Sequence, residues 1–568
     1  FDSHNNKINI YVTKGCNQPI YLEAYVPADT APGTYNGQVT VKTSLGDFQK
    51  ELTVQVHSAT VPELKDADFT YFNWMTDIAQ GYYNAWNAFT SYYGIRDVKE
   101  DGSDFTDDFY EILNNWAKST TDHRQNMVMI STTALLDAAN STVDTDGNYT
   151  FDWTLFDKYV DVWLKHGVTR LAGIHFGYHG KDVMLKDDGN GNAAFAWEPY
   201  SVDQAKYNKE NDNWYRQYLP ALAKHLEGYK LDQYPQFQGT ENETLFDIWC
   251  QHLYDEPSDN RLWLYYADLA DTYLVNSSGK QTKLFDADNN GCTQNAAIAG
   301  KMDILVPLES IAHGSAAYYQ QQANAGKEFW TYVCIGPGKP WLNRFVHQPD
   351  TTYPLLFWYN AQIDATGYLH WGMNVWNVGP FADGDSYMVY PDIEGKTLLS
   401  SIRFDGQRDG VEDWELARLA RETDPVKTQA LLNMAVTNPS GRYVTNLQDF
   451  RALRHALLEL ASGKELSQLP ELSGNKDGVP ELPENAYYVD DTDNRIQYTG
   501  MDVSTESGTS YGGSVHYNNF SGTVGTDGGS AEFSFTGTGI AVMGEKGFNA
   551  GNLRVDLYDA ERKLVDTK

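Results

Sequence analysis

The central part of the chain alternates between amphipathic segments of helical length and short apolar runs. This pattern extends over residues 65–462, and clear apolar runs lie at residues 126–130, 169–174 and 246–249. Short apolar runs bounded by turns are typical of buried strands, and the longer amphipathic segments predict helices. Their alternation over about 400 residues predicts a (β/α)8 barrel with insertions. A doubly wound sheet is the alternative, but no glycine-rich phosphate loop follows these strands.

On both sides of this region, apolar and polar residues alternate with a period of two, as in partly exposed strands. Residues 1–64 hold such runs around a turn rich in Pro and Gly at 31–37, which predicts part of a β-sandwich. Residues 463–485 are rich in Gly, Pro, Ser and charge, so we expect a linker. Residues 486–568 predict a second, truncated β-sandwich. The expected fold class is therefore α/β, a TIM-like (β/α)8 barrel between an N-terminal β-sandwich and a C-terminal β-sandwich module.

The charge of the chain excludes several classes of partner. With 43 Lys+Arg against 77 Asp+Glu the formal net charge is -34, which repels nucleic acids and anionic lipid surfaces. No run approaches the roughly 20 apolar residues that a membrane span needs, so we expect no membrane span. The chain begins and ends within strand-like regions, and we expect an excised segment whose signal peptide or wall anchor has been removed. The sequence leaves the oligomeric state open.

Aromatic residues are abundant and cysteines are few. The 568 residues include 15 Trp and 38 Tyr, which either line sugar sites by stacking on the C–H faces of the rings or fill a large barrel. The four cysteines form no C-x-x-C pair, so a zinc site is not expected, although one disulfide bridge is an open alternative. We therefore expect no metal and no cofactor.

Two adjacent carboxyls, Asp255 and Glu256, are the strongest candidates for chemistry. They follow the apolar run 246–249, and Pro257 ends the predicted strand because it cannot donate to the ladder. Catalytic groups of a barrel lie at the C-terminal ends of its strands. Neighbours on a regular strand point to opposite faces, but at a strand end the chain turns and both carboxyls can reach one ligand.

A second group of polar residues follows the apolar run that ends at Ile174. His175 and Tyr178 lie where that strand opens into a loop, and we expect them to bind substrate. His175, His179 and His252 do not show a metal-ligand spacing, so hydrogen bonding to hydroxyls or backbone is the preferred interpretation.

Several separated segments resemble a known enzyme family. They are the His-Leu-Tyr-Asp-Glu-Pro run at 252–257, Phe-Trp-Thr-Tyr-Val-Cys at 329–334, Gly-Tyr-Leu-His-Trp-Gly-Met-Asn-Val-Trp at 367–376, and Ser-Ile-Arg at 401–403 leading to 408–415. In this order they resemble glycoside hydrolase family 123 and its relatives in domain of unknown function 4091, over about residues 10–425. The resemblance implies a β-N-acetylgalactosaminidase with an N-terminal β-sandwich, a barrel, and Asp255 and Glu256 as its Asp-Glu pair. The tail resembles modules of secreted bacterial glycosidases, either carbohydrate-binding or spacers, and implies a secreted or cell-surface bacterial protein.

The resemblance implies a mechanism in which the 2-acetamido group of the substrate attacks the anomeric carbon. On this hypothesis Glu256 is the acid and then the base, with a pKa raised by apolar surroundings, and Asp255 stabilises the oxazolinium ring. Tyr332 is the expected donor to the acetamide oxygen, or else a core tyrosine. The expected subsite residues are Trp330, Trp371, Trp376, Asn374 and His370. Because Trp371 and Trp376 are five residues apart, a regular strand places them on opposite faces.

Two other functions are compatible with these residues. One is a two-carboxylate glycosidase acting on a sugar without an acetamido group, with Glu309 or Asp364 as the second carboxyl. The other is a sugar-binding surface protein without catalysis. The charged segment 401–410 precedes a predicted helix at 412–421, and we expect it to have a structural role at the end of the barrel. Sugar identity and the choice between exo and endo cleavage stay open.

Overall fold

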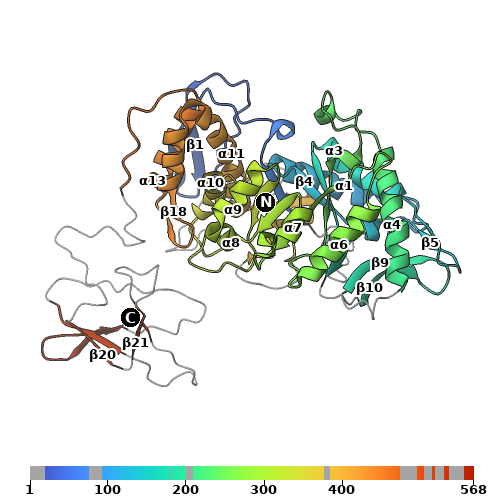
Figure 1. The fold of residues 1–568 in the computed structure, drawn as a ribbon. Helices are drawn as coiled ribbons and strands as arrows, with labels where there is room; N and C mark the ends of the chain where they lie inside the picture. Colours follow the sequence, from blue (N-terminus) through green and yellow to red (C-terminus); the bar gives the residue numbers. More distant parts are fainter. Residues whose placement is uncertain are drawn as a thin grey trace. The chain divides into compact units, whose positions relative to one another are not determined.

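The computed structural model describes ten stretches of the chain. They are residues 20–75, 92–178, 181–199, 209–376, 384–473, 495–499, 501–504, 515–517, 530–535 and 555–567. The chain divides into two compact units, Phe1–Gly474 and Asn475–Lys568, and each is described by itself (Figure 1). Among the described residues no helix is both long and apolar enough to cross a membrane.

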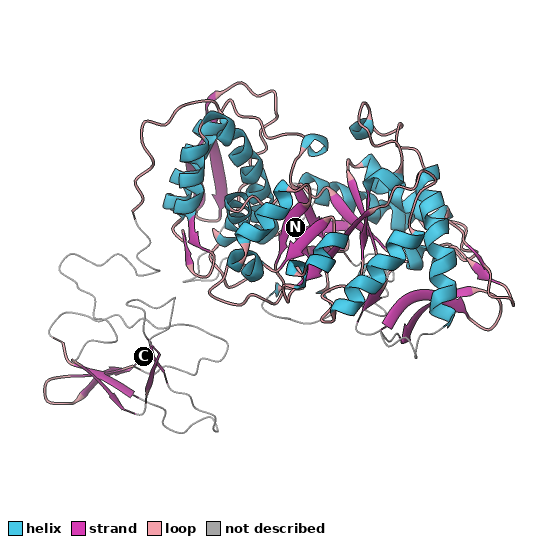
Figure 2. Ribbon diagram, in the orientation of Figure 1, coloured by secondary structure: helices cyan, strands magenta, loops and turns pink. Residues whose placement is uncertain are grey.

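Eight parallel strands form the centre of the first unit (Figure 2). In sheet order they are β3 (Thr70–Asn73), β15 (Gly367–His370), β14 (Glu328–Tyr332), β13 (Ile304–Pro307), β12 (Lys283–Asp288), β11 (Trp249–His252), β7 (Arg170–Gly173) and β4 (Met127–Ile130). The two edge strands meet through Asn126, whose Oδ1 accepts from the Tyr71 N–H at 3.0 Å and whose N–H donates to the Tyr71 carbonyl at 3.3 Å. The sheet is thus nearly closed, as the expected (β/α)8 barrel requires.

Alternation along each strand divides the apolar residues between two cores. On β14, Trp330 and Tyr332 belong to the cluster inside the barrel, whereas Phe329 belongs to the larger cluster between strands and helices. The inner cluster contains Phe72, Trp74, Met127, Met129, Ala172, Ile174, Cys250, Phe285, Ala287, Ile304, Val306, Trp330, Tyr332 and Leu369. A continuous apolar strand sequence therefore fits a strand that is buried on both faces.

Helices surround the sheet. They are α1 (Asp107–Asp122), α2 (Thr132–Ala138), α3 (Thr154–Lys165), α4 (Lys209–Gly228), α5 (Leu245–Ile248), α6 (Asn260–Tyr273), α7 (Ala296–Lys301), α8 (Glu309–Gly314), α9 (Ala316–Asn324), α10 (Thr352–Gln362), α11 (Ile402–Thr423), α12 (Pro425–Ala435) and α13 (Leu447–Ala461). Smaller pairings join β5 (Thr142–Val143) to β6 (Tyr149–Thr150), β8 (Gly177–Tyr178) to β9 (Lys181–Asp187) and β10 (Ala193–Pro199), β16 (Tyr390–Asp392) to β17 (Thr397–Leu399), and β18 (Val436–Asn438) to β19 (Arg442–Tyr443).

Two boundaries differ from the sequence prediction. The run 246–249 was expected as a strand, but residues Leu245–Ile248 form the helical turn α5 and the strand is Trp249–His252. The reason is a capping box in which Thr244 and Asp247 satisfy each other's backbone N–H groups. The helix expected at 412–421 begins at Ile402, where Ser401 caps it by accepting from the Phe404 N–H. The charged segment therefore lies inside α11, where Arg403 donates to the carbonyls of Arg344 and Gly384.

A charged network fills the lower end of the barrel, where the strands begin. Arg170, at the start of β7, donates through both terminal nitrogens to the Glu328 carboxylate at 2.7 Å, and Lys283 adds a third contact at 2.7 Å. Burial raises the pKa of Glu328, but the Arg170 guanidinium outweighs that effect and holds it at about 2. The Arg170 guanidinium also lies over the Trp330 ring at 5.3 Å.

The expected β-sandwiches are not confirmed. Among the described residues, the N-terminal region contains one antiparallel hairpin of β1 (Gly33–Thr43) and β2 (Gly46–Val56). In the second unit the described strands form three two-stranded pairings. They are β20 (Ile496–Thr499) with β23 (Ser530–Phe533), β21 (Asp502–Ser504) with β22 (Val515–Tyr517), and β24 (Asp556–Tyr558) with β25 (Leu564–Thr567). Only residues 463–473 of the expected linker are described.

Candidate active site

The chain makes an unusual turn after β11, at the C-terminal end of the barrel. Asp255 and Glu256 both have positive φ angles, 84° and 50°, a conformation that costs an L-residue about 1–2 kcal/mol. The neighbouring strand stabilises the turn, because the Asp286 carboxylate accepts the backbone N–H groups of Tyr254 and Asp255, each at 2.8 Å. Two consecutive carboxyls are thus held out of the strand at the barrel mouth, as predicted for this pair.

Asp286 is supported in turn by His252. Both side chains are fully buried, and His252 Nε2 lies 3.0 Å from Asp286 Oδ1. Burial lowers the pKa of His252 to about 3, so its imidazole is neutral and Nε2–H donates to the carboxylate. His252, Asp255 and Asp286 each offer a metal-ligand atom within 4.8 Å of the others. Asp286 already accepts three N–H groups, however, so this set fits a hydrogen-bonded support better than a metal site.

Glu256 receives two side-chain donors from neighbouring strands. The Tyr332 hydroxyl at the end of β14 donates to Oε1, and the Asn289 amide just after β12 donates to Oε2 at 2.9 Å. Burial is the largest influence on the Glu256 carboxyl and raises its pKa. The hydrogen bond from Tyr332 lowers this pKa and the charge of Asp286 raises it, so that the pKa is raised overall. Burial likewise raises the pKa of Tyr332 far above its ordinary value, so the phenol remains a donor. A carboxyl in this environment is suited to general acid catalysis.

A second polar group lies at the end of β15. His370 Nε2 is 3.0 Å from Asp385 Oδ1, and the Trp371 indole N–H donates to Asp385 Oδ2 at 2.8 Å. The fully buried Arg344 donates to the main-chain carbonyl of Asp385 at 2.7 Å and to Asn73 Oδ1 at 3.1 Å. Trp371 is half-buried and packs on the inner cluster of the barrel. These contacts fix the orientation of its ring at the barrel mouth.

The structure separates the other expected subsite residues. Trp330 is fully buried, and its N–H donates to Glu328 Oε2 at 3.2 Å in the lower network, so the expectation that it forms a subsite wall is wrong. Trp376 donates to the Val389 carbonyl at 2.7 Å and packs against Trp116, in the core outside the barrel, and is also not a subsite wall. The strand ends at His370, so no regular strand joins the two tryptophans.

The polar residues expected to read sugar hydroxyls are largely enclosed. His370 and Asn374 are both buried, and His370 is engaged by Asp385. His175 is also buried, with its ring centroid 5.3 Å from that of His252 and 6.1 Å from that of Trp74. His175, His370 and Asn374 are therefore positioned to support the mouth rather than to present an open surface. Tyr178 lies in β8, its side chain is outside the described part of the structure, and so is His179.

The carboxyls considered for a two-carboxylate mechanism lie apart from the turn at Asp255 and Glu256. Asp364 lies before β15, at the lower end of the barrel, and pairs with Arg421 at 3.1 Å. Glu309 begins α8 and is buried, with the phenols of Tyr359, Tyr368 and Tyr443 near enough to feel its charge. Burial raises the pKa of Glu309 well above its ordinary value, which disfavours the ionised form that a nucleophile needs.

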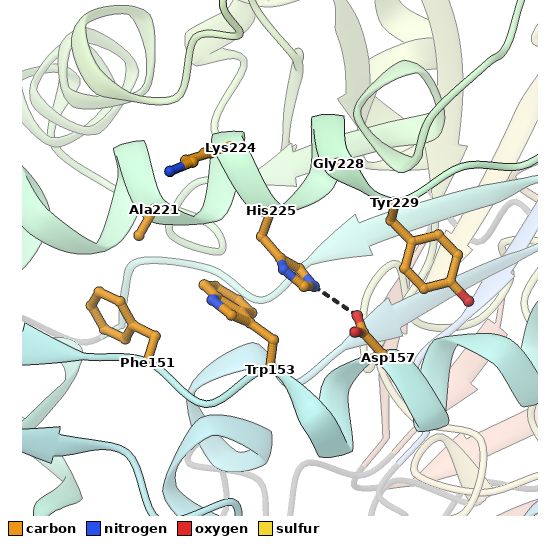
Figure 3. A pocket seen from close by; sticks show the side chains of 8 residues that line it. All are labelled: Phe151, Trp153, Asp157, Ala221, Lys224, His225, Gly228 and Tyr229. Carbon is orange, nitrogen blue, oxygen red and sulfur yellow. Dashed lines mark hydrogen bonds and ion pairs between the residues drawn. The ribbon is translucent and has the colours of Figure 1, made fainter.

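A cavity of about 570 Å³ lies outside the barrel, between α3 and α4 (Figure 3). The Trp153 ring stacks on His225 at 4.4 Å, and His225 Nε2 lies 2.6 Å from Asp157 Oδ1. The other lining residues are Phe151, Ala221, Lys224, Gly228 and Tyr229. None of them belongs to the barrel mouth, so this cavity is separate from the candidate site.

Three supporting residues were not found from the sequence. Asp286 lies within the strand run Lys-Leu-Phe-Asp-Ala-Asp, Asn289 follows the same strand, and Asp385 lies in a loop 15 residues after His370. A charged residue inside an apolar strand is a usable signal for Asp286, since burying an unpaired carboxyl is costly. Asn289 could be found as a polar residue at the C-terminal end of a barrel strand. No local pattern indicates Asp385.

Comparisons with known proteins agree with this geometry. Residues 100–420 match the model of the glycoside hydrolase 123 catalytic domain. A family 123 glycoside hydrolase from Clostridium perfringens, studied for glycolipid glycan hydrolysis, superposes with a TM-score of 0.57 at 17% identity, covering 77% of this chain and 76% of that one. An endo-β-1,4-mannanase from Thermotoga petrophila gives a TM-score of 0.34 at 11% identity, covering 62% and 78%. A comparison with curated protein sequences gives no significant match.

The family match spans more than half of the chain and includes the turn at Asp255 and Glu256, the strand β12 and Trp371. The superposition independently supports the fold of the barrel. The chain therefore belongs to glycoside hydrolase family 123 and carries the catalytic domain of a glycosidase.

Proposed function

We propose that this glycosidase cleaves β-linked 2-acetamido-2-deoxy sugars, GalNAc in particular, with retention and through an oxazolinium intermediate. The observation that carries the proposal is the turn at Asp255 and Glu256, where two consecutive carboxyls leave the strand together. Consecutive residues approach a sugar from one side. A direct displacement by an enzyme carboxylate instead needs two carboxyls on opposite sides of the bond, about 5 Å apart.

Glu256 is the general acid and then the general base in this proposal. Its raised pKa keeps the proton available at the pH at which substrate binds, and transfer of that proton to the glycosidic oxygen releases the aglycone. Glu256, now ionised, accepts from Tyr332 and Asn289 and then takes a proton from the attacking water. These two donors stabilise the charged form, so the carboxyl can alternate between its two roles.

Asp255 acts as the carboxylate partner of the substrate's acetamide. The N–H of that group becomes more acidic as its carbonyl oxygen attacks the anomeric carbon, and a fixed carboxylate favours the developing positive charge. The Tyr332 hydroxyl, which keeps its proton, is our candidate donor to the acetamide oxygen while Glu256 is protonated; once Glu256 has given up its proton, the same hydroxyl donates to the Glu256 carboxylate. Trp371 is our candidate platform for the sugar ring, since a half-buried indole offers a flat apolar surface.

The other carboxyls near the described strand ends have different tasks. Asp286 holds the turn, and Asp385 holds His370 and Trp371. Asp288 accepts the backbone N–H groups of Cys292 and Thr293 at 2.9 and 2.8 Å, which closes a loop. Because Asp286, Asp385 and Asp288 each hold part of the protein in place, their contacts favour a nucleophile supplied by the substrate.

We further propose an extracellular or cell-surface site of action and a glycan of the glycolipid type as one natural substrate. The first rests on the resemblance of the C-terminal region to modules of secreted glycosidases. The second rests on the related enzyme from Clostridium perfringens, whose study concerns glycolipid glycans.

A panel of chromogenic glycosides tests the substrate class. Turnover of β-GalNAc and β-GlcNAc glycosides without turnover of the plain β-galactoside and β-glucoside supports the proposal, and equal rates on both sets contradict it. Glu256→Gln should then lower kcat on a natural glycan by about 10² to 10⁴. Glu309→Gln is the matched control, because it removes another buried carboxyl and should leave kcat unchanged. A large loss of activity in Glu309→Gln would favour the two-carboxylate mechanism.

A further inference from the structure

Three potential metal ligands meet on the outer surface of the first unit, at the junction between the N-terminal hairpin and α13. His57 directly follows β2, and His455 and Glu459 lie on α13. One ligand atom from each of the three lies within 4.8 Å of the other two. The two imidazole rings are 5.3 Å apart with an interplanar angle of 66°, and His57 Nδ1 is 3.1 Å from Glu459 Oε1.

Other contacts hold the two segments that carry the cluster, which are α13 and the residues after β2. His455 and Glu459 are four residues apart, so they share one face of α13, while Leu453, Leu457 and Leu460 on another face are fully buried. The segment that carries His57 is fixed to the end of the same helix. The Ala59 N–H donates to Ser462 Oγ at 3.1 Å, and Ser58 Oγ donates to the Ser462 carbonyl at 3.4 Å. The backbone therefore holds the three side chains together independently of any ion.

We propose that His57, His455 and Glu459 bind one divalent transition-metal ion, with Zn²⁺ as the best fit. Two imidazoles and one carboxylate are a ligand set that Zn²⁺ accepts, with bonds of about 2.0–2.2 Å, and water completes a tetrahedron. Tetrahedral ligands at such bond lengths are about 3.3 Å apart, so small side-chain rotations close the site. Mg²⁺ and Ca²⁺ prefer oxygen ligands and higher coordination numbers.

The present partners of the cluster are compatible with this assignment. Lys464 pairs with Glu459 at 2.9 Å, but its side chain is 60% exposed and can turn into solvent when an ion neutralises the carboxylate. The Glu459 side chain is 21% exposed and His455 is exposed, so an ion has a path to the site.

The ion would cross-link two distant parts of the chain. His57 and His455 are almost 400 residues apart, which explains why ligand spacing in the sequence gave no signal. Joining them fixes the hairpin β1–β2, most of whose residues are exposed, to a helix whose other face is buried. A ligand that binds only the folded state raises stability by mass action. The cluster shares no residue with the catalytic turn, so the ion would affect stability and leave catalysis unchanged.

The test compares the full chain, free of affinity tags, with three variants after treatment with a chelator. Calorimetric titration with ZnCl₂ should give one bound equivalent and a higher Tm for the wild type, whereas MgCl₂ should give neither. His455→Ala should lose both effects, and since His455 is exposed the metal-free Tm should change little. Glu459→Gln, which keeps the shape of the side chain, should weaken Zn²⁺ binding at least tenfold. His347→Ala, a second exposed histidine, is the matched control and should behave as the wild type.

Two further results decide between this site and other zinc ligands. Chelation should leave the kcat of the wild type unchanged on an aryl glycoside. If His455→Ala binds Zn²⁺ as the wild type does, and alkylation of the thiols Cys250, Cys292 and Cys334 abolishes that binding, the cysteines are the ligands and the proposal is wrong. Absence of Zn²⁺ binding to the wild type would overturn it equally.

Discussion

The backbone N–H of Asp255 donates to the Asp286 side chain at 2.8 Å, so the turn after β11 takes its geometry from the neighbouring strand β12. The same carboxylate accepts from Tyr254 and His252, and it is fully buried. A buried residue of the neighbouring strand thus holds the backbone of the turn that carries Asp255 and Glu256.

Replacing this support should damage activity and stability together. In Asp286→Asn one acceptor oxygen becomes an amide N–H₂ group that faces a backbone N–H, which should cost about 1–3 kcal/mol in the free energy of unfolding. Displacement of the turn should lower kcat about 100-fold. Urea denaturation and initial rates measure the two effects. Asp303→Asn is the control, because Asp303 accepts the Leu284 N–H at 2.9 Å at the lower end of the barrel; an equal loss of kcat there would contradict the positioning role.

The pH dependence of the reaction should report on the bond between Tyr332 and Glu256. The acid must be protonated, so kcat/KM should be highest below the pKa of Glu256 in the folded protein and fall as pH rises through it. That pKa is raised, which moves this alkaline limb above the range of an ordinary glutamate. The Tyr332 hydroxyl stabilises the carboxylate, so Tyr332→Phe should raise the pKa further and shift the limb to higher pH. A shift to lower pH would show that Tyr332 stabilises the protonated form.

The electron density of the acetamide oxygen should control the rate if the substrate supplies the nucleophile. Replacing the N-acetyl group by N-trifluoroacetyl should depress kcat steeply, and Asp255→Asn should be severely impaired because the oxazolinium loses its counter-charge. A thiazoline mimic should bind much more tightly than the product. Little dependence on the N-acyl group, together with a 2-fluoro sugar trapped on Asp255 in mass spectrometry, would overturn substrate assistance and leave the glycosidase assignment intact.

The two tryptophans of the 367–376 segment should give contrasting kinetic phenotypes. Trp371→Ala removes an indole at the barrel mouth and should raise KM about tenfold, equivalent to about 1.4 kcal/mol, with a smaller change in kcat. Trp376→Phe removes a partly buried N–H that bonds the Val389 carbonyl, so it should lower Tm and leave KM unchanged. If KM rises in Trp376→Phe and not in Trp371→Ala, our choice between the two residues is wrong.

The barrel was predictable because its strands are buried on both faces and its helices on one, and these patterns are local. The run 126–130 became β4 with its start displaced by one residue. The position of Asp255 and Glu256 at a strand end was predictable because it follows from the same pattern, and their catalytic role stays a prediction. The supports could not be predicted, because Asp286 reaches the turn by strand pairing and Asp385 reaches Trp371 across a loop. Trp330 was assigned wrongly because a strand sequence does not tell which layer of the barrel an inward side chain fills.

The positive φ angles of Asp255 and Glu256 have a consequence for the evolution of the enzyme. Glycine and asparagine adopt this conformation with the least cost, whereas β-branched residues hardly adopt it at all. A change of Glu256 to Gly or Asn would therefore relieve the backbone and remove the proposed acid in one step. Inactive homologues that have turned into sugar-binding proteins should arise readily by this route, and they should be more heat-stable than their active ancestors.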